Sequence, residues 1–206
     1  MHQRVMKGCP APINRHCAAS IIADIWIILH SCRTGTKDNM HPLTRELIDR
    51  LRGHFKLDWR GIHGAPHWAR VRANGLYLSR LTGGDPEVVT LFAFLHDACR
   101  NDDDRDPWHG YRAVSFITGL SSHEMPLTAG KRENLLTACA LHTEGHTSGY
   151  NMTVLTCWDA DRLDLGRVGV RPDTRYLCTD AARDERVIER AWKSSRGLDA
   201  MARSSA

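Results

Sequence analysis

The sequence predicts an all-α protein with one main domain. From His41 onward, apolar residues recur at helical spacing in segment after segment, and no stretch alternates apolar and polar residues as a half-buried strand does. Proline, aspartate and glycine stand where these segments begin and end, as they do at helix termini. At 206 residues the chain is long enough for one domain with a full core. We therefore expect a helical domain over residues 40–206, without internal repeats or linkers.

Composition narrows the function classes. Apolar residues make up 42% of the chain and charged residues 25%, as in soluble globular proteins. The net charge of +4 is small and the basic residues are scattered, which argues against a stable nucleic-acid partner and suits a small anionic substrate. The seven cysteines include no C-x-x-C pair, so we read them as reduced thiols of a cytoplasmic protein.

Residues 1–39 differ from the rest of the chain. The apolar run over 18–29 is interrupted by Asp24 and is shorter than the ~20 residues that a membrane-spanning helix needs. Asp24, His30 and the lack of a small-residue cleavage site argue against a secretion signal. Two interpretations stay open, an extra helix packed on the domain and an extension ahead of the true start. Because Met40 opens the well-patterned part, we favour the extension and expect no membrane association.

Capping residues and spacing predict the first two helices. Thr44 can cap a helix whose apolar residues recur every four positions, at Leu47, Leu51 and Phe55. A glycine-rich turn over 61–64 follows, and Pro66 then stands in the first turn of a helix that runs to about Leu81. One face of that second helix is expected to point to the core, and it consists of His67, Val71, Asn74 and Leu78.

The third helix leads into the most informative stretch of the sequence. Asp85-Pro86 supplies a cap and a first-turn proline, and five apolar residues over 91–95 run straight into His96-Asp97, which we place in the last turn. Burying an ionisable pair is costly unless something compensates for the lost hydration. A metal ion would compensate, because imidazole and carboxylate both bind divalent cations. The structural alternative is a buried hydrogen bond between the two side chains.

Two more helices each carry a histidine at one end. The first begins at Asp106-Pro107, has His109 in its first turn and ends near Gly119. The second spans about 128–143 and has His142 in its last turn, shortly before a glycine. We expect its buried residues to be Leu135, Leu136 and Cys139.

The next predicted helix carries two aspartates whose orientation can be predicted from their spacing. A helix over about 153–165 has Asp161 on its apolar face and Asp159 nearly opposite, so we expect Asp161 and not Asp159 to face the core. A final helix over about 183–192 precedes a polar tail of small residues that we expect to be disordered.

The core-facing ionisable residues follow one another in the order H…HD…D. This arrangement resembles the HD-domain superfamily of metal-dependent phosphohydrolases, which carries the same pattern on a bundle of helices. The matching segments are APHWARV around His67, FLHD around His96-Asp97, and DADRLD around Asp161. The resemblance covers roughly residues 60–175. It implies an HD-domain-like helical bundle in which His67, His96, Asp97 and Asp161 hold a metal ion.

The resemblance and the donor chemistry together set expectations for the metal. A mixed nitrogen and oxygen set suits Mn, Fe, Co, Ni or Zn, and Mg less well because Mg prefers oxygen. In relatives with two ions, further histidines between the HD pair and the last Asp bind the second ion. By analogy His109 and His142 either hold a second ion, with Asp97 bridging both, or lie outside the ligand set and bind phosphate or orient a ligand carboxylate.

The resemblance implies hydrolysis of a nucleotide or another small phosphate ester by a metal-activated water, with Asp97 as the catalytic residue. Two alternatives are a di-iron oxygenase of the same fold and a non-enzymatic ligand-sensing HD module. No substrate-binding residue and no oligomeric state is predicted. Arginines near the motifs are candidates for binding the anion or for surface ion pairs, such as one between Arg162 and Asp159; they are Arg70, Arg100, Arg105, Arg112 and Arg162.

Other polar and aromatic residues near the motifs are given structural interpretations. His63 and His146 lie beside glycines in loops, and we expect both to be exposed. Three tryptophans flank the motifs and are expected in the core: Trp68, Trp108 and Trp158. Three cysteines are expected to be buried as small apolar residues: Cys99, Cys139 and Cys157.

Overall fold

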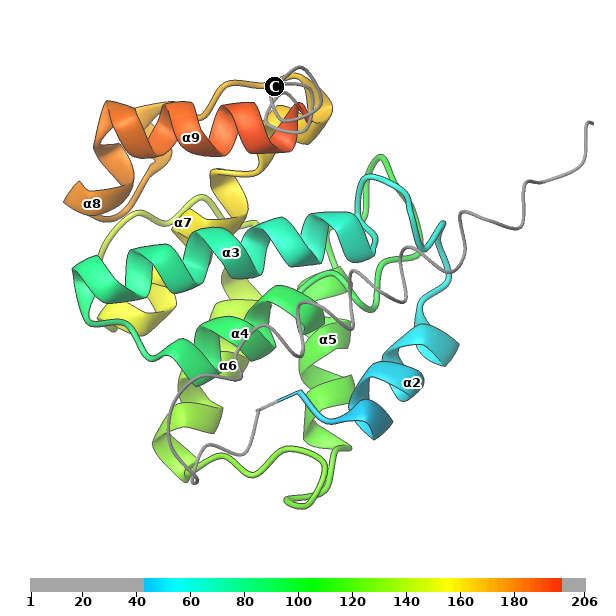
Figure 1. The fold of residues 1–206 in the computed structure, drawn as a ribbon. Coiled ribbons are helices and arrows are strands. Elements are labelled where there is room, and N and C mark those ends of the chain that lie inside the picture. Colours follow the sequence, from blue (N-terminus) through cyan, green and yellow to red (C-terminus); the bar gives the residue numbers. More distant parts are fainter. Residues whose placement is uncertain (1–42, 198–206) are drawn as a thin grey trace, which may run out of the picture. The chain divides into compact units, whose positions relative to one another are not determined.

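The structure, a computed structural model, describes residues 43–197. The expected extension over 1–39 and the end of the expected tail, 198–206, lie outside the described residues. Every regular element between 43 and 197 is helical, which confirms the all-α prediction (Figure 1). No helix in this range is both long and apolar enough to cross a membrane. The elements are α2 (Arg45–His54), α3 (Ala65–Thr82), α4 (Pro86–Leu95), α5 (His109–Thr118), α6 (Ala129–Leu141), α7 (Met152–Arg162), the 3-10 helices η1 (Leu165–Val168) and η2 (Thr174–Tyr176), α8 (Asp180–Arg183) and α9 (Glu185–Ser195).

Several helix ends follow from local chemistry. The Thr44 hydroxyl accepts the Leu47 N–H at the start of α2. The Asp85 carboxylate accepts the N–H groups of the first turn of α4. Gly83 ends α3 with φ of 76°, in the left-handed region that favours glycine.

Several other helix ends differ by a few residues from the prediction. Helices α4 and α6 end one residue before His96 and His142, so each histidine caps its helix instead of lying in the last turn. Helix α5 begins at His109 and not at Asp106-Pro107. The Asp106 carboxylate does not cap α5, because it accepts the Asn101 N–H and binds Arg112.

The helices pack around α3, α4, α6 and α7. Helix α3 contacts both α4 and α7, and α6 contacts α4, α5 and α7. Helices α8 and α9 pack on α3 on the side away from α4 (Figure 1). The chain therefore returns at its C-terminal end to cover the helix that carries His67.

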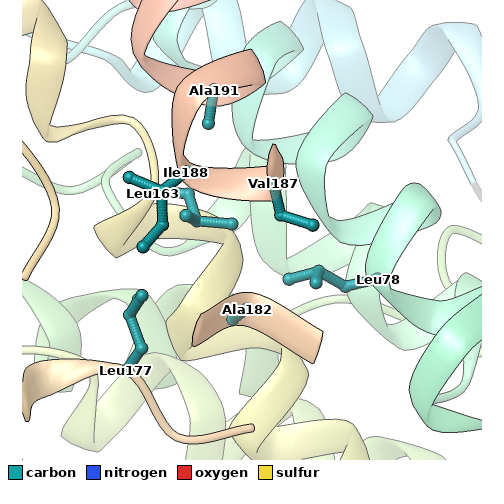
Figure 2. Packing of buried hydrophobic residues seen from close by; sticks show 7 residues of the cluster. All are labelled: Leu78, Leu163, Leu177, Ala182, Val187, Ile188 and Ala191. Atoms are coloured by element: carbon teal, nitrogen blue, oxygen red, sulfur yellow. The ribbon is translucent and has the colours of Figure 1, made fainter. Parts of the chain in front are cut away.

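A buried apolar cluster joins α3 to the C-terminal helices. Its side chains come from α3, from the segment after α7 and from α8 and α9, and they face one another in Figure 2. The members are Leu78, Leu163, Leu177, Ala182, Val187, Ile188 and Ala191. Removing this much apolar surface from water fixes the C-terminal helices on α3.

Burial differs from the prediction in α7, at Trp108 and in α6. Every residue of α7 from Thr153 to Ala160 is buried, so the expected outer face with Asp159 on it does not exist there. Trp68 and Trp158 lie in the core as expected, but Trp108 is 66% exposed. Trp108 stands just ahead of α5 and packs beside Tyr111, which is itself exposed, with ring centroids 5.9 Å apart. In α6, Leu135 and Cys139 are buried but Leu136 is only half-buried.

Gly75 lies where α3 packs tightly against α4 and α7. A Cβ at this position would lie 2.2 Å from Val89 Cγ1 in α4 and 3.3 Å from Ala160 Cβ in α7. We expect Gly75→Ala to lower the free energy of unfolding by about 1–3 kcal/mol, because the helices must move apart. Chemical denaturation measures the change.

The matched control is Gly53→Ala in α2, where a Cβ meets nothing within 4 Å. We expect this change to be neutral or to stabilise by up to about 1 kcal/mol, because alanine favours the helix. Equal effects of the two substitutions would contradict the packing described for Gly75.

Candidate metal centre

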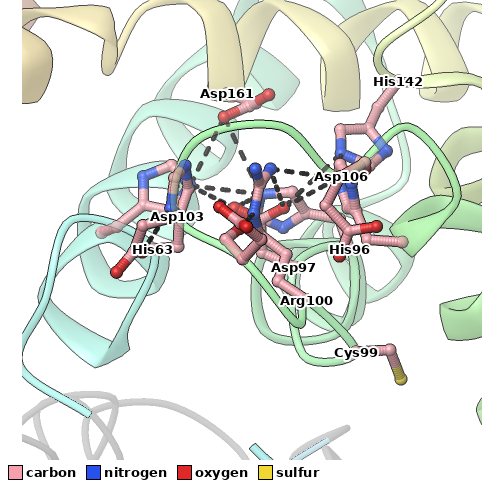
Figure 3. A network of polar contacts seen from close by, with 12 residues as sticks. His63, His96, Asp97, Cys99, Arg100, Asp103, Asp106, His142 and Asp161 are labelled. Atoms are coloured by element: carbon pink, nitrogen blue, oxygen red, sulfur yellow. Dashed lines mark hydrogen bonds and ion pairs between the residues drawn. The ribbon is translucent and has the colours of Figure 1, made fainter. Parts of the chain in front are cut away.

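Six ionisable side chains from five helices meet at one place. They lie at or beside helix ends, and Figure 3 shows Asp97, His96, His142 and Asp161 turned toward a common centre. The six are His67, His96, Asp97, His109, His142 and Asp161. These are the residues that the sequence proposed for one or two ions. The structure thus brings together side chains up to 94 positions apart.

The first group of atoms contains four side chains. His67 Nε2 lies 3.2 Å from His96 Nε2 and 3.4 Å from Asp161 Oδ1. Asp97 Oδ2 lies 3.6 Å from each of the two imidazole nitrogens. Metal–ligand distances of about 2.0–2.2 Å place neighbouring ligand atoms roughly 3.0–3.5 Å apart around one ion. The separations in this group are close to those values.

A second group shares Asp97 with the first. Asp97 Oδ1 lies 3.0 Å from His109 Nε2 and 3.7 Å from His142 Nε2. The two imidazole nitrogens are 2.8 Å apart. Each oxygen of the Asp97 carboxylate therefore faces a different pair of histidines. His142 also lies with His96 and Asp161 in a group whose ligand atoms are all within 4.8 Å of one another, so it adjoins both groups.

Backbone and carboxylate acceptors fix the orientation of all four imidazoles. In His96 and His142, Nδ1 donates to the carbonyls of Phe92 and Cys139, at 3.0 and 2.8 Å. His109 Nδ1 donates to the Asp106 carbonyl. His67 Nδ1 faces Asp164 Oδ2 at 2.7 Å. An oxygen acceptor requires the proton on Nδ1, which leaves the Nε2 lone pair directed at the common centre.

The result is a centre where lone pairs of nitrogen and carboxylate oxygen face one another with little access to water. His67 and His96 have no exposed side-chain surface, and Asp97 is 3% exposed. Such an arrangement is repulsive unless a positive charge lies between the atoms. Protons or metal ions can supply that charge. The buried histidines and aspartates can thus hold a metal ion.

The pKa shifts agree with a neutral His96 and ionised carboxylates. Burial lowers the pKa of His96 to about 3 against the opposing pull of the two aspartates. Burial would raise the pKa of Asp161, but His96 and Arg167 bring it down to about 2. Asp97 is likewise held well below its usual pKa range against burial, by His96 and by contacts with His109 and His142. For His142 burial is outweighed by Asp97, which raises the pKa, so a proton competes with a cation at its Nε2.

Asp164 supports the centre and was missed by the sequence analysis as a separate residue. Its carboxylate is 1% exposed, accepts from His67 Nδ1, and forms a two-point ion pair with Arg70 at 2.7 and 3.0 Å. A carboxylate behind a ligating imidazole holds its ring in place and raises its basicity. The signal was present in the segment DADRLD, because Asp164 follows Asp161 by one helical turn.

Asp159 is buried for a different reason. Its Oδ1 accepts the Cys178 N–H at 2.6 Å, and its Oδ2 accepts the N–H and hydroxyl of Thr179 at 2.9 and 2.7 Å. The prediction that Asp159 lies on an outer face of the helix is wrong. Burial raises the pKa of Asp159 against these hydrogen bonds. Asp159 therefore ties α7 to the segment that leads into α8.

His63 is also buried, contrary to the prediction of an exposed loop histidine. It is 7% exposed, and its Nδ1 lies 2.9 Å from Asp103 Oδ1 in the charged loop after α4. Burial lowers the pKa of His63, with Asp103 acting in the opposite direction. His146 is exposed, as expected. The three cysteines near the histidines are buried as expected, and burial raises the pKa of Cys99, Cys139 and Cys157.

The candidate arginines separate into different roles. Arg100 is 8% exposed, with Nη1 3.6 Å from Asp97 Oδ1, whereas Arg105 is exposed. Arg112 binds Asp106 and the Cys99 carbonyl. Arg162 donates to the carbonyls of His146 and Tyr176, at 2.8 and 2.7 Å, and not to Asp159 as the sequence suggested. Arg167, which the sequence analysis did not consider, lies beside Asp161.

Comparisons with known proteins add no family assignment. No protein-family model, no curated protein and no solved structure matches this chain. The case for the centre therefore depends on its own geometry.

Substitution by Asn distinguishes the roles of the two aspartates of α7, Asp159 and Asp161. We expect Asp161→Asn to lose bound metal, because its carboxylate oxygen lies in the first group. Asp159→Asn should keep the metal but lower the free energy of unfolding by about 1–3 kcal/mol, since its amide would face backbone donors with one acceptor fewer. Metal analysis and denaturation measure both effects. The opposite pattern of metal loss would show that the two roles are reversed.

Metal stoichiometry tests whether Asp97 serves two ions. Because its two oxygens face separate pairs of histidines, we expect roughly two metal equivalents per chain in carefully metallated protein, and about one in His109→Ala and His142→Ala. His123→Ala, at an exposed position, is the control. A single equivalent in the wild-type protein would rule out the two-ion centre and a di-iron oxygenase with it.

Proposed function

We propose that this chain is a metal-dependent phosphohydrolase of the HD-domain superfamily, acting on a nucleotide or another small phosphate ester. The observation that carries the proposal is the buried convergence of four imidazole nitrogens on Asp97 and Asp161. The order of these residues along a helical chain, H…HD…D, supports the superfamily assignment. The helix ends from which they project support an HD-domain-like bundle.

The donor set favours a divalent transition metal. Four nitrogens with two carboxylates suit Mn, Fe, Co, Ni or Zn better than Mg, which prefers oxygen ligands. The fixed Nδ1 hydrogen bonds mean that binding an ion requires little reordering of the rings.

The chain's own residues position and neutralise the reacting groups. Divalent ions held by this donor set would acidify a bound water and polarise a phosphoryl group. Asp97 is central, because its oxygens contact both pairs of histidines, so its loss would disorganise both groups. Asp164 with Arg70 holds the His67 ring, and the buried walls around Asp97 keep bulk water from weakening these electrostatic contacts.

A di-iron oxygenase is the second candidate. The placement of the Asp97 carboxylate between two pairs of histidines also suits two irons. Metal analysis separates the candidates, since the oxygenase requires two irons and dioxygen and the hydrolase requires neither. A ligand-sensing module would retain the metal without turnover.

The function is tested with purified, metallated protein and a panel of phosphorylated metabolites with added Mn. We expect phosphate release, reduced about a thousandfold or more in Asp97→Ala because several kcal/mol of metal-dependent stabilisation is lost. Asp180→Ala, which removes a fully exposed carboxylate, is the control and should retain activity. An Asp97→Ala protein with wild-type metal content and turnover would contradict the mechanism.

A further inference from the structure

Arg167 has a buried guanidinium with two nitrogens, Nε and Nη1, that have no hydrogen-bond partner among the described residues. Its side chain is 10% exposed. The nearest carboxylate oxygens, on Asp161 and Asp164, are 3.8 and 4.0 Å from Nη1, beyond hydrogen-bonding distance. Asp164 already accepts from Arg70 and His67. Arg167 is therefore not needed as the partner of Asp164.

Unused donors on a buried charged group are costly. Arginine stays protonated in proteins, so Arg167 cannot reduce this cost by losing its charge. Burying such donors without acceptors costs more than burying a neutral group. An anionic ligand would supply the missing acceptors, and the planar guanidinium matches two oxygens of a phosphate.

The position of Arg167 points to the same ligand. Asp161 is the most accessible of the six side chains of the centre, at 17% exposed, whereas the other five are 0–3% exposed. A ligand therefore approaches the centre on the Asp161 side, where Arg167 Nη1 stands. The buried Asp161 Oδ1 also has no hydrogen-bond partner. Free donors of Arg167 thus adjoin the accessible edge of the candidate metal site.

A second guanidinium lies at the Asp97 end of the centre. Arg100 Nη1 is 3.6 Å from Asp97 Oδ1, and its Nε is fixed by the Asp102 carbonyl at 3.1 Å. The centre and its surroundings contain three carboxylates, those of Asp97, Asp161 and Asp164. Three arginines lie beside them, Arg70, Arg100 and Arg167. With neutral histidines these charges cancel before metal binds. Each divalent ion then adds two positive charges. A centre with one or two ions therefore favours a multiply charged anion.

We propose that Arg167 binds the phosphate of the substrate at the accessible edge of the metal centre, and that the substrate carries a terminal phosphate monoester dianion. This inference rests on the proposed hydrolase function and assigns that function a substrate-binding residue. Arg167 donates from its guanidinium N–H groups to non-bridging phosphate oxygens. Arg100 adds positive charge at the other end.

Inorganic phosphate is the probe, titrated calorimetrically into the metal-loaded full chain. We expect Arg167→Gln to weaken phosphate binding roughly 10–100-fold, the loss expected for hydrogen bonds to a charged group, with metal content unchanged. Arg167→Lys should recover part of the affinity, because it restores the charge without the planar pair of donors. Arg186→Gln removes an arginine that is 91% exposed and should bind phosphate as the wild type does.

Two results would overturn the proposal. One is phosphate affinity within twofold of wild type in a folded, metal-loaded Arg167→Gln protein. The other is loss of metal in that variant, which would make Arg167 a support of the centre. If Arg167→Gln does not fold, Arg167→Lys decides by the same two measurements. Phosphate binding that depends on Arg167 in a protein without hydrolase activity would support the anion site and refute the proposed hydrolase.

Discussion

The structure depends on one electrostatic constraint, the need for positive charge among lone pairs that face one another around Asp97. Each imidazole has its Nδ1 occupied by a carbonyl or carboxylate, so the Nε2 atoms cannot all turn away as donors to other groups. The helices then hold these atoms 2.8–3.8 Å apart in a region with almost no exposed surface. This combination is stable only with a cation or with bound protons at the centre.

The helical bundle meets this constraint through its helix ends. Carbonyls in the last turns of α4 and α6, those of Phe92 and Cys139, accept from Nδ1 of His96 and His142 and so orient the two rings. Helix α7 contributes on several sides at once: Asp161 faces the centre, whereas Asp159 binds the chain ahead of α8. Asp164, just beyond the helix, holds His67. The geometry of the centre therefore depends on how α7 is packed.

The sequence predicts local features well and long-range ones poorly. Helix spacing and capping predicted α2 to α7, because Thr44, Asp85 and Gly83 act on their immediate neighbours. Burial of His63 depends on Asp103, 40 positions away, and that of Asp164 on His67, 97 positions away. Periodicity cannot reveal such pairs. It also fails for α7, because a helix buried on all sides has no polar face to set the phase. The sequence could not single out Arg167, because only the folded surroundings show which of its donors lack a partner.

The three hydrogen bonds to Asp159 set a limit on where this chain can be shortened. The donors come from Cys178 and Thr179, almost twenty positions beyond the acceptor, yet Asp159 is only two residues from Asp161. A chain ending before Cys178 would leave the Asp159 carboxylate in the core without these donors, two residues from Asp161 at the accessible edge of the centre. The segment through Thr179 is therefore part of the smallest unit that can keep α7 in place, although neither Cys178 nor Thr179 belongs to the centre.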